Sequence, residues 1–98
     1  MFEAIIKTGN TMLDRKIDEA IRVAREMYES QDSPRKKLLI KGLLRAAIGF
    51  RVAEYLKLDG QKSRYAEKAD KFYRYLDRVG VEERTAVDMV KRITKIIV

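Results

Sequence analysis

Lysine and arginine are unevenly distributed along this sequence of 98 residues. Residues 1–32 contain five Lys or Arg against seven Asp or Glu, a net charge of −2, whereas residues 33–98 contain 17 against eight, a net charge of +9. The change falls at the run Ser-Pro-Arg-Lys-Lys that begins at Ser33. Cationic groups gathered on one surface attract anions over a long range. These residue types therefore indicate the binding of an anion or a polyanion.

One group of cations has a helical spacing within residues 63–79. On a helical wheel of about 100° per residue, four cations and a tyrosine share an arc of roughly 80°, centred about 130° from the apolar face. The acids of this segment, Glu67, Asp70 and Asp77, lie on the far flank. The pattern predicts an exposed basic ribbon. Its members are Arg64, Lys68, Lys71, Tyr75 and Arg78.

A second group occupies the start of the helix predicted at residues 34–58. The positive end of a helix dipole favours acids in the first turn, yet this turn contains Arg35, Lys36 and Lys37. A local rule broken without evident compensation is a place to look for function. Cations beside the free N–H groups of a helix start form an anion site of the kind that binds phosphate.

A hairpin that turns near residue 60 would bring these groups to one end of the molecule. The first half of the helix at 34–58 then lies level with the last half of the helix at 63–79. The sequence does not determine whether the two groups face the same side. The cations that this geometry gathers are Arg35, Lys36, Lys37, Lys41, Arg45, Lys71, Arg74 and Arg78.

Catalysis and metal binding have little support in this composition. The chain has no His and no Cys, which removes thiolate nucleophiles, soft zinc ligands and the side chain that titrates near neutrality. Asp59–Gly60 is the nearest approach to a loop for a hard cation, and it lacks further acids. We therefore expect no enzymatic activity, no cofactor and no metal site.

Four amphipathic segments must position the cations, and no strand pattern appears. They are expected at residues 11–30, with Thr11 as N-cap, and at 34–58, 63–79 and 82–98. Ser33 and Pro34 form a strong start signal, and Asp59–Gly60 is expected to end the second helix. Residues Phe2 to Lys7 are expected to form a short helical turn. With loops of two to four residues, the sequence predicts an all-α, small antiparallel four-helix bundle that is a single helical domain over residues 1–98.

The expected core follows the apolar faces. The first helix presents seven apolar side chains at helical spacing, whereas the second switches its buried side near Gly49 and should be the central helix. Gly42 and Gly49 cost roughly 1 kcal/mol each in a helix interior, so we expect another helix to approach closely there. Four aromatic residues are assigned to the core by default. The two sets are Leu13, Ile17, Ala20, Ile21, Ala24, Met27 and Tyr28, and Tyr55, Tyr65, Phe72 and Tyr73.

Plainer interpretations of the same residues remain open. The ribbon is equally explained as a solvated helix face with the i, i+4 pairs Glu67–Lys71 and Asp70–Arg74. The aliphatic end of the chain, Ile93 to Val98, is either core closure or a contact in a homodimer.

Two functional hypotheses result. The first is non-enzymatic binding of an RNA or DNA backbone, or of a ribonucleoprotein, through phosphates and without base specificity. The second is a small helical interaction subunit or adaptor that docks an acidic protein partner. No uncharged stretch approaches the ~20 apolar residues of a membrane span, and Phe2 to Ile6 contains Glu3 and lacks a small-residue cleavage site. We expect a cytoplasmic protein with no membrane partner.

Overall fold

The computed structural model describes residues 8–97, and within them the chain forms four α-helices and no strand. The prediction of a small all-α bundle is confirmed. The short helical turn expected at Phe2 to Lys7 lies outside the described residues. The helices are α1 (Thr11–Glu29), α2 (Pro34–Tyr55), α3 (Asp59–Arg78) and α4 (Glu83–Thr94).

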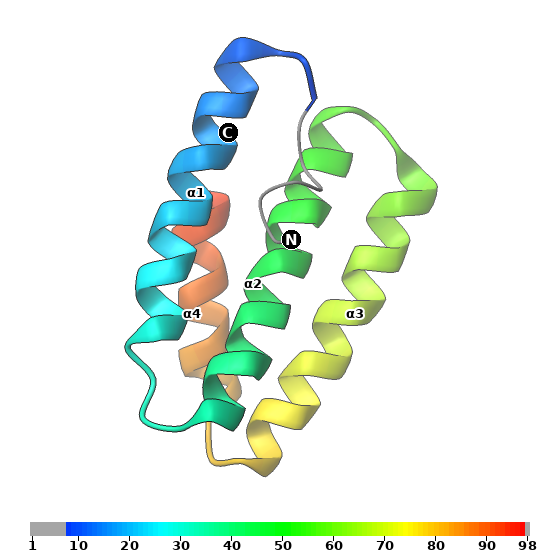
Figure 1. Ribbon diagram of the computed structural model, residues 1–98. Coiled ribbons are helices and arrows are strands. Elements are labelled where there is room, and N and C mark those ends of the chain that lie inside the picture. Colours follow the sequence, from blue (N-terminus) through cyan, green and yellow to red (C-terminus); the bar gives the residue numbers. More distant parts are fainter. Residues whose placement is uncertain (1–7, 98) are drawn as a thin grey trace.

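The four helices run alternately up and down, and α2 is the central one (Figure 1). Helices α1 and α3 lie on opposite sides of α2, and α4 lies behind, against α1 and α2. Helix α3 packs mainly on α2 and much less on α4. One side of the α2–α3 pair therefore faces α4, and the other side faces away from the rest of the bundle.

The N-cap of helix α1 lies one residue before the predicted cap. Asn10 is the N-cap, and its side-chain oxygen accepts a hydrogen bond of 3.1 Å from the Leu13 N–H. The carboxylate of Asp14 turns back and accepts from the N–H of Thr8 at 3.0 Å and from its hydroxyl at 2.7 Å. The prediction of Thr11 as N-cap is wrong because Asn, a better cap than Thr, lies directly before it.

The turn between α2 and α3 also differs from the prediction. Helix α2 ends at Tyr55, and the residue that takes the left-handed conformation is Lys57, with φ of 58°. The Leu58 N–H reaches back to the Ala53 carbonyl at 2.8 Å, which closes the helix end as in a Schellman motif. Asp59 and Gly60 then start α3, because an acid suits the positive end of a helix. They are not the stop signal that the sequence suggests.

The core is apolar throughout. All seven residues predicted for the inner face of α1 are buried, as are side chains on nearly every side of the middle of α2. Ile93 and Ile97 are 0% and 1% exposed, so these two residues of the aliphatic end help to close the core. The largest fully buried side chains are Leu13, Ile17, Ile40, Leu43, Leu44, Ile48, Leu76, Ile93 and Ile97.

The aromatic residues are less buried than predicted. Tyr55 is 51% exposed and is the last residue of α2, although Val52 and Ala53 of the same turn are buried. Tyr65, Phe72 and Tyr73 are half-buried. They belong to α3, where Leu76 is the one fully buried residue among those described, since this helix packs mainly on α2 and leaves much of its surface to solvent.

Gly42 and Gly49 of α2 allow the close approach that the sequence predicts. A Cβ added at Gly42 would overlap the ring of Phe72, and one added at Gly49 would overlap the ring of Tyr65. Both rings come from α3, so two aromatic side chains lie directly on the α2 backbone. The glycines thus fix the distance between the two helices that position the predicted cations.

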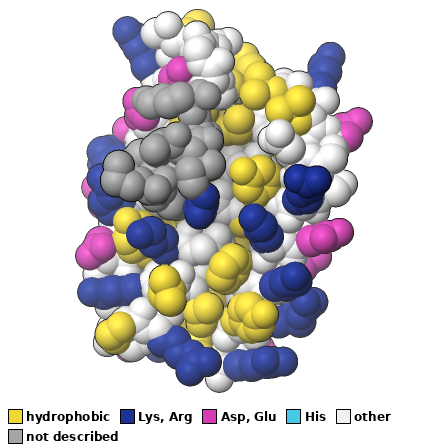
Figure 2. Space-filling view, turned by 45° about the vertical axis from the view of Figure 1, so that its right-hand side comes forward, with side chains coloured by type: hydrophobic (Ala, Val, Ile, Leu, Met, Phe, Trp, Pro, Cys, Tyr) yellow, Lys and Arg dark blue, Asp and Glu magenta, His cyan; other side chains and the backbone are white. Residues whose placement is uncertain are grey.

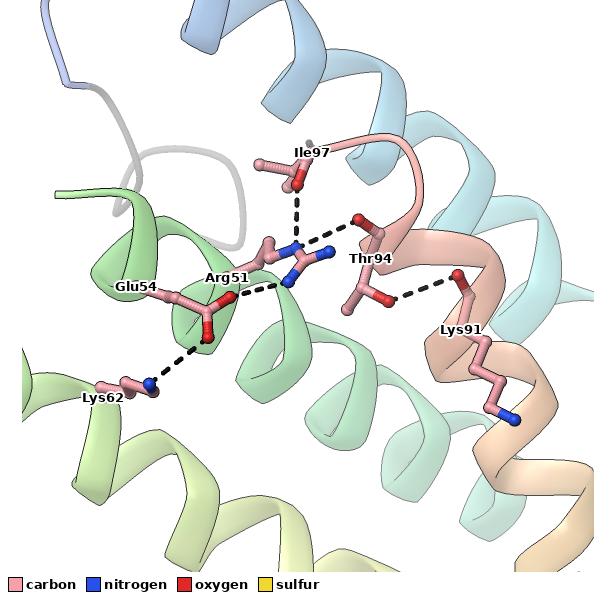
Figure 3. A network of polar contacts seen from close by, with 6 residues as sticks. All are labelled: Arg51, Glu54, Lys62, Lys91, Thr94 and Ile97. Carbon is pink, nitrogen blue, oxygen red and sulfur yellow. Dashed lines mark hydrogen bonds and ion pairs between the residues drawn. The ribbon is translucent and has the colours of Figure 1, made fainter. Parts of the chain in front are cut away.

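A polar network connects the C-terminal part of α2 to α3 and to the residues around the end of α4 (Figure 3). Arg51 donates from Nε to the carbonyl oxygens of Ile97 at 2.9 Å and Thr94 at 3.3 Å. Its terminal nitrogen contacts Glu54 at 2.7 Å, and Lys62 of α3 contacts the other oxygen of Glu54 at 3.3 Å. The hydrogen bond from Arg51, and next the one from Lys62, holds the pKa of Glu54 below its usual value.

Candidate anion-binding site

A groove follows the outer side of the α2–α3 contact, away from α4. It consists of two adjoining hollows of about 310 and 520 Å³, which share Gly42, Arg45, Phe72 and Tyr75. In the space-filling view, Lys and Arg side chains surround hydrophobic ones in the lower half, where α2 begins and α3 ends (Figure 2). We name this feature the basic groove. Its lining residues are Leu38, Leu39, Lys41, Gly42, Arg45 and Ala46 of α2, and Tyr65, Lys68, Lys71, Phe72 and Tyr75 of α3.

The structure brings cations of both helices to this groove. Lys41 and Arg45 come from α2, and Lys68 and Lys71 come from α3. The sequence left open whether the two groups face one side, and for these four residues the structure shows that they do. The reason is that Gly42 lies between Lys41 and Arg45 at the point where Phe72 of α3 crosses.

None of the described residues that line the groove is acidic. Lys41, Arg45, Lys68 and Lys71 form no ion pair within residues 8–97. The expected pairs Glu67–Lys71 and Asp70–Arg74 are not formed between these described residues either, so that interpretation of the ribbon is wrong in this detail. Ion pairs of described cations lie outside the groove, as those of Arg22 with Glu19 and Glu26 do. The charge of the groove is thus not neutralised locally.

Aromatic rings form much of the groove surface. Tyr75 meets Phe72 edge to face, with ring centroids 6.2 Å apart and planes at 86°. The Arg78 guanidinium carbon lies 6.0 Å from the centre of the Tyr75 ring, and Lys68 Nζ lies 5.7 Å from that of Tyr65. These neighbours orient the Tyr75 ring, although 42% of the residue remains exposed.

The start of α2 contributes less than the sequence suggests. The ammonium group of Lys36 pairs with Asp32 at 3.2 Å, and the Ser33 hydroxyl accepts from the Lys36 N–H at 3.2 Å. An anion bound here would have to compete with Asp32 for the Lys36 ammonium group and with the Ser33 hydroxyl for the Lys36 N–H. Arg35, Lys36 and Lys37 do not line the groove.

The remaining predicted residues lie beside the groove. Arg64 is exposed in the first half of α3 and lines neither hollow. Arg74 and Arg78 line a different hollow together with Tyr73 and two acids, Asp77 and Glu83. Burial, with smaller effects of the negative charges of Asp70 and Glu83, raises the pKa of the Tyr73 hydroxyl. That mixed environment is a poorer place for a polyanion than the basic groove.

Two groove residues escape sequence reasoning. Leu38 is 68% exposed at the mouth of one hollow, and its spacing of three and seven residues from Lys41 and Arg45 is the signal that places it on their face of the helix. Phe72 is assigned to the core by its periodicity, although it faces both the core and the groove. The available signal for Phe72 was Gly42, whose position in a helix indicates that a large side chain lies upon it.

Other classes of site are not supported by the described part of the chain. No three His, Cys, Asp or Glu residues among positions 8–97 gather in a way that could hold a metal ion. None of the described helices combines the length and apolar character needed to cross a membrane.

The fold and the groove define this chain as a small helical bundle with a basic, aromatic-lined groove between its second and third helices. A scan against protein-family models gives no match, and neither does a search of curated proteins or of solved structures.

Proposed function

We propose that this protein is a non-enzymatic, cytoplasmic nucleic-acid-binding protein. It binds an RNA or DNA backbone, bare or within a ribonucleoprotein, through phosphate contacts in the basic groove and without base specificity. One observation supports this above all: Lys41, Arg45, Lys68 and Lys71 come from two helices to one groove and have no acidic partner among the described residues.

The charge of the whole chain supports the same function. A net charge of +7 draws a polyanion toward the molecule, and the groove gives it a place to bind. Four phosphate contacts predict that log K falls with log salt at a slope of about −3 to −4. Because phosphates are common to all sequences, such contacts position a ligand and do not read its bases.

The test is a titration of labelled RNA and DNA at two salt concentrations with a matched pair of variants. Arg45→Gln with Lys71→Gln removes two groove cations, and the slope should become shallower by about 1.4 to 1.8. Lys91→Gln with Arg92→Gln removes the same charge from exposed positions of α4, outside the groove, and should leave the slope almost unchanged. Absence of binding at low salt, or equal losses in both variants, would refute the proposal.

A second function, an adaptor for an acidic protein, is favoured by the exposed side chains of Leu38 and Tyr75 beside the cations. Such apolar contacts are common at the centre of protein interfaces. Capture of partners from native lysate, with and without nuclease, separates the two functions. Partners that disappear after nuclease treatment support nucleic-acid binding, whereas a partner retained after it supports the adaptor.

A further inference from the structure

We infer that the ligand of the basic groove is single-stranded nucleic acid, with bases stacked on Tyr75 and phosphates on the surrounding cations. This inference rests on the proposed function and adds the strandedness of the ligand to it. Phosphate contacts alone would give the aromatic side chains of the groove no role. Stacking of bases gives them one.

The surface of the groove combines apolar and cationic side chains. Leu38 is 68% exposed and Tyr75 is 42% exposed. Both line the groove together with the cations Lys41 and Arg45. A duplex hides its base faces inside the stack and presents phosphates and base edges. A single strand presents both phosphates and the apolar faces of its bases. A surface that alternates cations with aromatic and aliphatic side chains is therefore complementary to a single strand.

The Tyr75 ring is held in place by its neighbours. The Phe72 ring, with its centroid 6.2 Å away, and the Arg78 guanidinium, with its carbon 6.0 Å away, both lie against it. A ring held in this way loses little freedom when a base stacks on it, and preorganisation of this kind favours binding. The Phe72 ring is in turn fixed on the backbone of Gly42. The stacking platform is thus built on two rigid helices.

The position of the groove also favours a single strand. The groove lies between two helices in direct contact, and packed helices have axes about 8–10 Å apart. The glycines at positions 42 and 49 keep this pair close. A hollow of about 310 or 520 Å³ has room for one base of a single strand, whereas a duplex, which keeps its base faces inside the stack, would contact only the cations around it.

The experiment compares four labelled probes by fluorescence anisotropy: a 12-nucleotide oligothymidine, a 12-base-pair DNA duplex, inorganic polyphosphate and polyglutamate. The last two present negative charge without bases. We expect the single strand to bind about tenfold or more tightly than the duplex at equal salt. Tyr75→Ala should weaken binding of the single strand about tenfold and leave the duplex and polyphosphate unchanged, whereas Tyr75→Phe, which keeps the ring, should retain the preference.

Tyr55→Ala is the matched control, because Tyr55 is an exposed tyrosine at the far end of α2. It should leave every affinity unchanged, and circular dichroism should show native helicity for all variants. Equal affinity for single strand and duplex, or a Tyr75→Ala effect that is absent or uniform across probes, would overturn this inference but not the proposed function. Tight binding of polyglutamate would overturn it in favour of an acidic protein ligand. If no nucleic acid binds at low salt, the proposed function itself fails.

Discussion

Arg51 of α2 donates a hydrogen bond of 2.9 Å to the carbonyl oxygen of Ile97, 46 residues further along the chain. The same Nε also contacts the Thr94 carbonyl, and the guanidinium contacts Glu54 (Figure 3). The last described residues are thereby bound to the C-terminal part of the central helix, α2. Carbonyl groups at the end of a helix have no N–H partner within the helix. At the end of α4, the Arg51 side chain donates the hydrogen bonds that these groups accept.

Substitution of Arg51 should therefore destabilise the fold. Arg51→Met keeps most of the apolar stem but removes the guanidinium, and we expect the free energy of unfolding to fall by about 1–3 kcal/mol, as for hydrogen bonds to a charged group. Urea denaturation measures the change. Arg45→Met is the control, because Arg45 is exposed, and it should change the free energy of unfolding by less than about 0.5 kcal/mol. Equal effects of the two substitutions would contradict this assignment.

The same network predicts a dependence of stability on pH. Hydrogen bonds from Arg51 and then Lys62 lower the pKa of Glu54 in the folded chain. A lowered folded pKa means that the contribution is present above the unfolded glutamate pKa, about 4.3, and is lost as the pH falls through the folded value. Glu54→Gln should thus destabilise the protein at neutral pH and have a smaller effect at acid pH. Urea titrations across this range test the trend, which should weaken in the Arg51→Met background.

The contact of Phe72 with Gly42 can be tested by a double-mutant cycle. Gly42→Ala gains up to about 1 kcal/mol of helix propensity, but its methyl group would overlap the Phe72 ring, and overpacking costs about 1–3 kcal/mol. We expect a net loss of up to about 2 kcal/mol in the wild type and a gain of about 1 kcal/mol in the Phe72→Ala background. Thermal or urea unfolding of the four proteins gives the coupling.

Gly60→Ala is the control for this cycle. Open space surrounds the position of its Cβ, and Gly60 lies in the first turn of α3 with no positive φ. The substitution should stabilise the protein by up to about 1 kcal/mol. If Gly42→Ala had the same effect with and without the Phe72 ring, the close approach would be disproved.

The register of the central helix predicts which substitutions damage the core. Leu43 is 0% exposed, so Leu43→Ala should lower the free energy of unfolding by about 2–5 kcal/mol. Ala47→Glu should destabilise the fold severely, because it places an unpaired charge at a site that is 4% exposed. Arg74→Ala, at an exposed position, should have little effect. Calorimetry or urea unfolding of these three variants gives the order, and a severe effect of Arg74→Ala would contradict it.

Much of the helical framework is determined locally by the sequence. Ser33 caps α2 through its hydroxyl and Pro34 opens the helix, as their types predict. The spacing of the apolar residues predicts the inner face of α1. Gly42 and Gly49 predict the close contact of α2 with another helix, which is α3. The caps and the inner face of α1 depend on interactions within one or two helical turns. The close contact depends on glycine, which in a helix interior indicates that another element lies on the backbone.

The site itself required the tertiary structure. The sequence supplied a set of cations, but the rotation and crossing of α2 and α3 decided that Arg45 and Lys71 share a groove while Arg74 faces Asp77 and Glu83. The turn at Lys57 was likewise unpredictable, because a lysine takes the left-handed conformation there and not the nearby glycine. The sequence by itself determined the four helical segments, except for the turn between α2 and α3, and which residues are charged. The packing of Phe72 and Tyr65 on the α2 backbone, between residues distant in the chain, decided which of those charges meet.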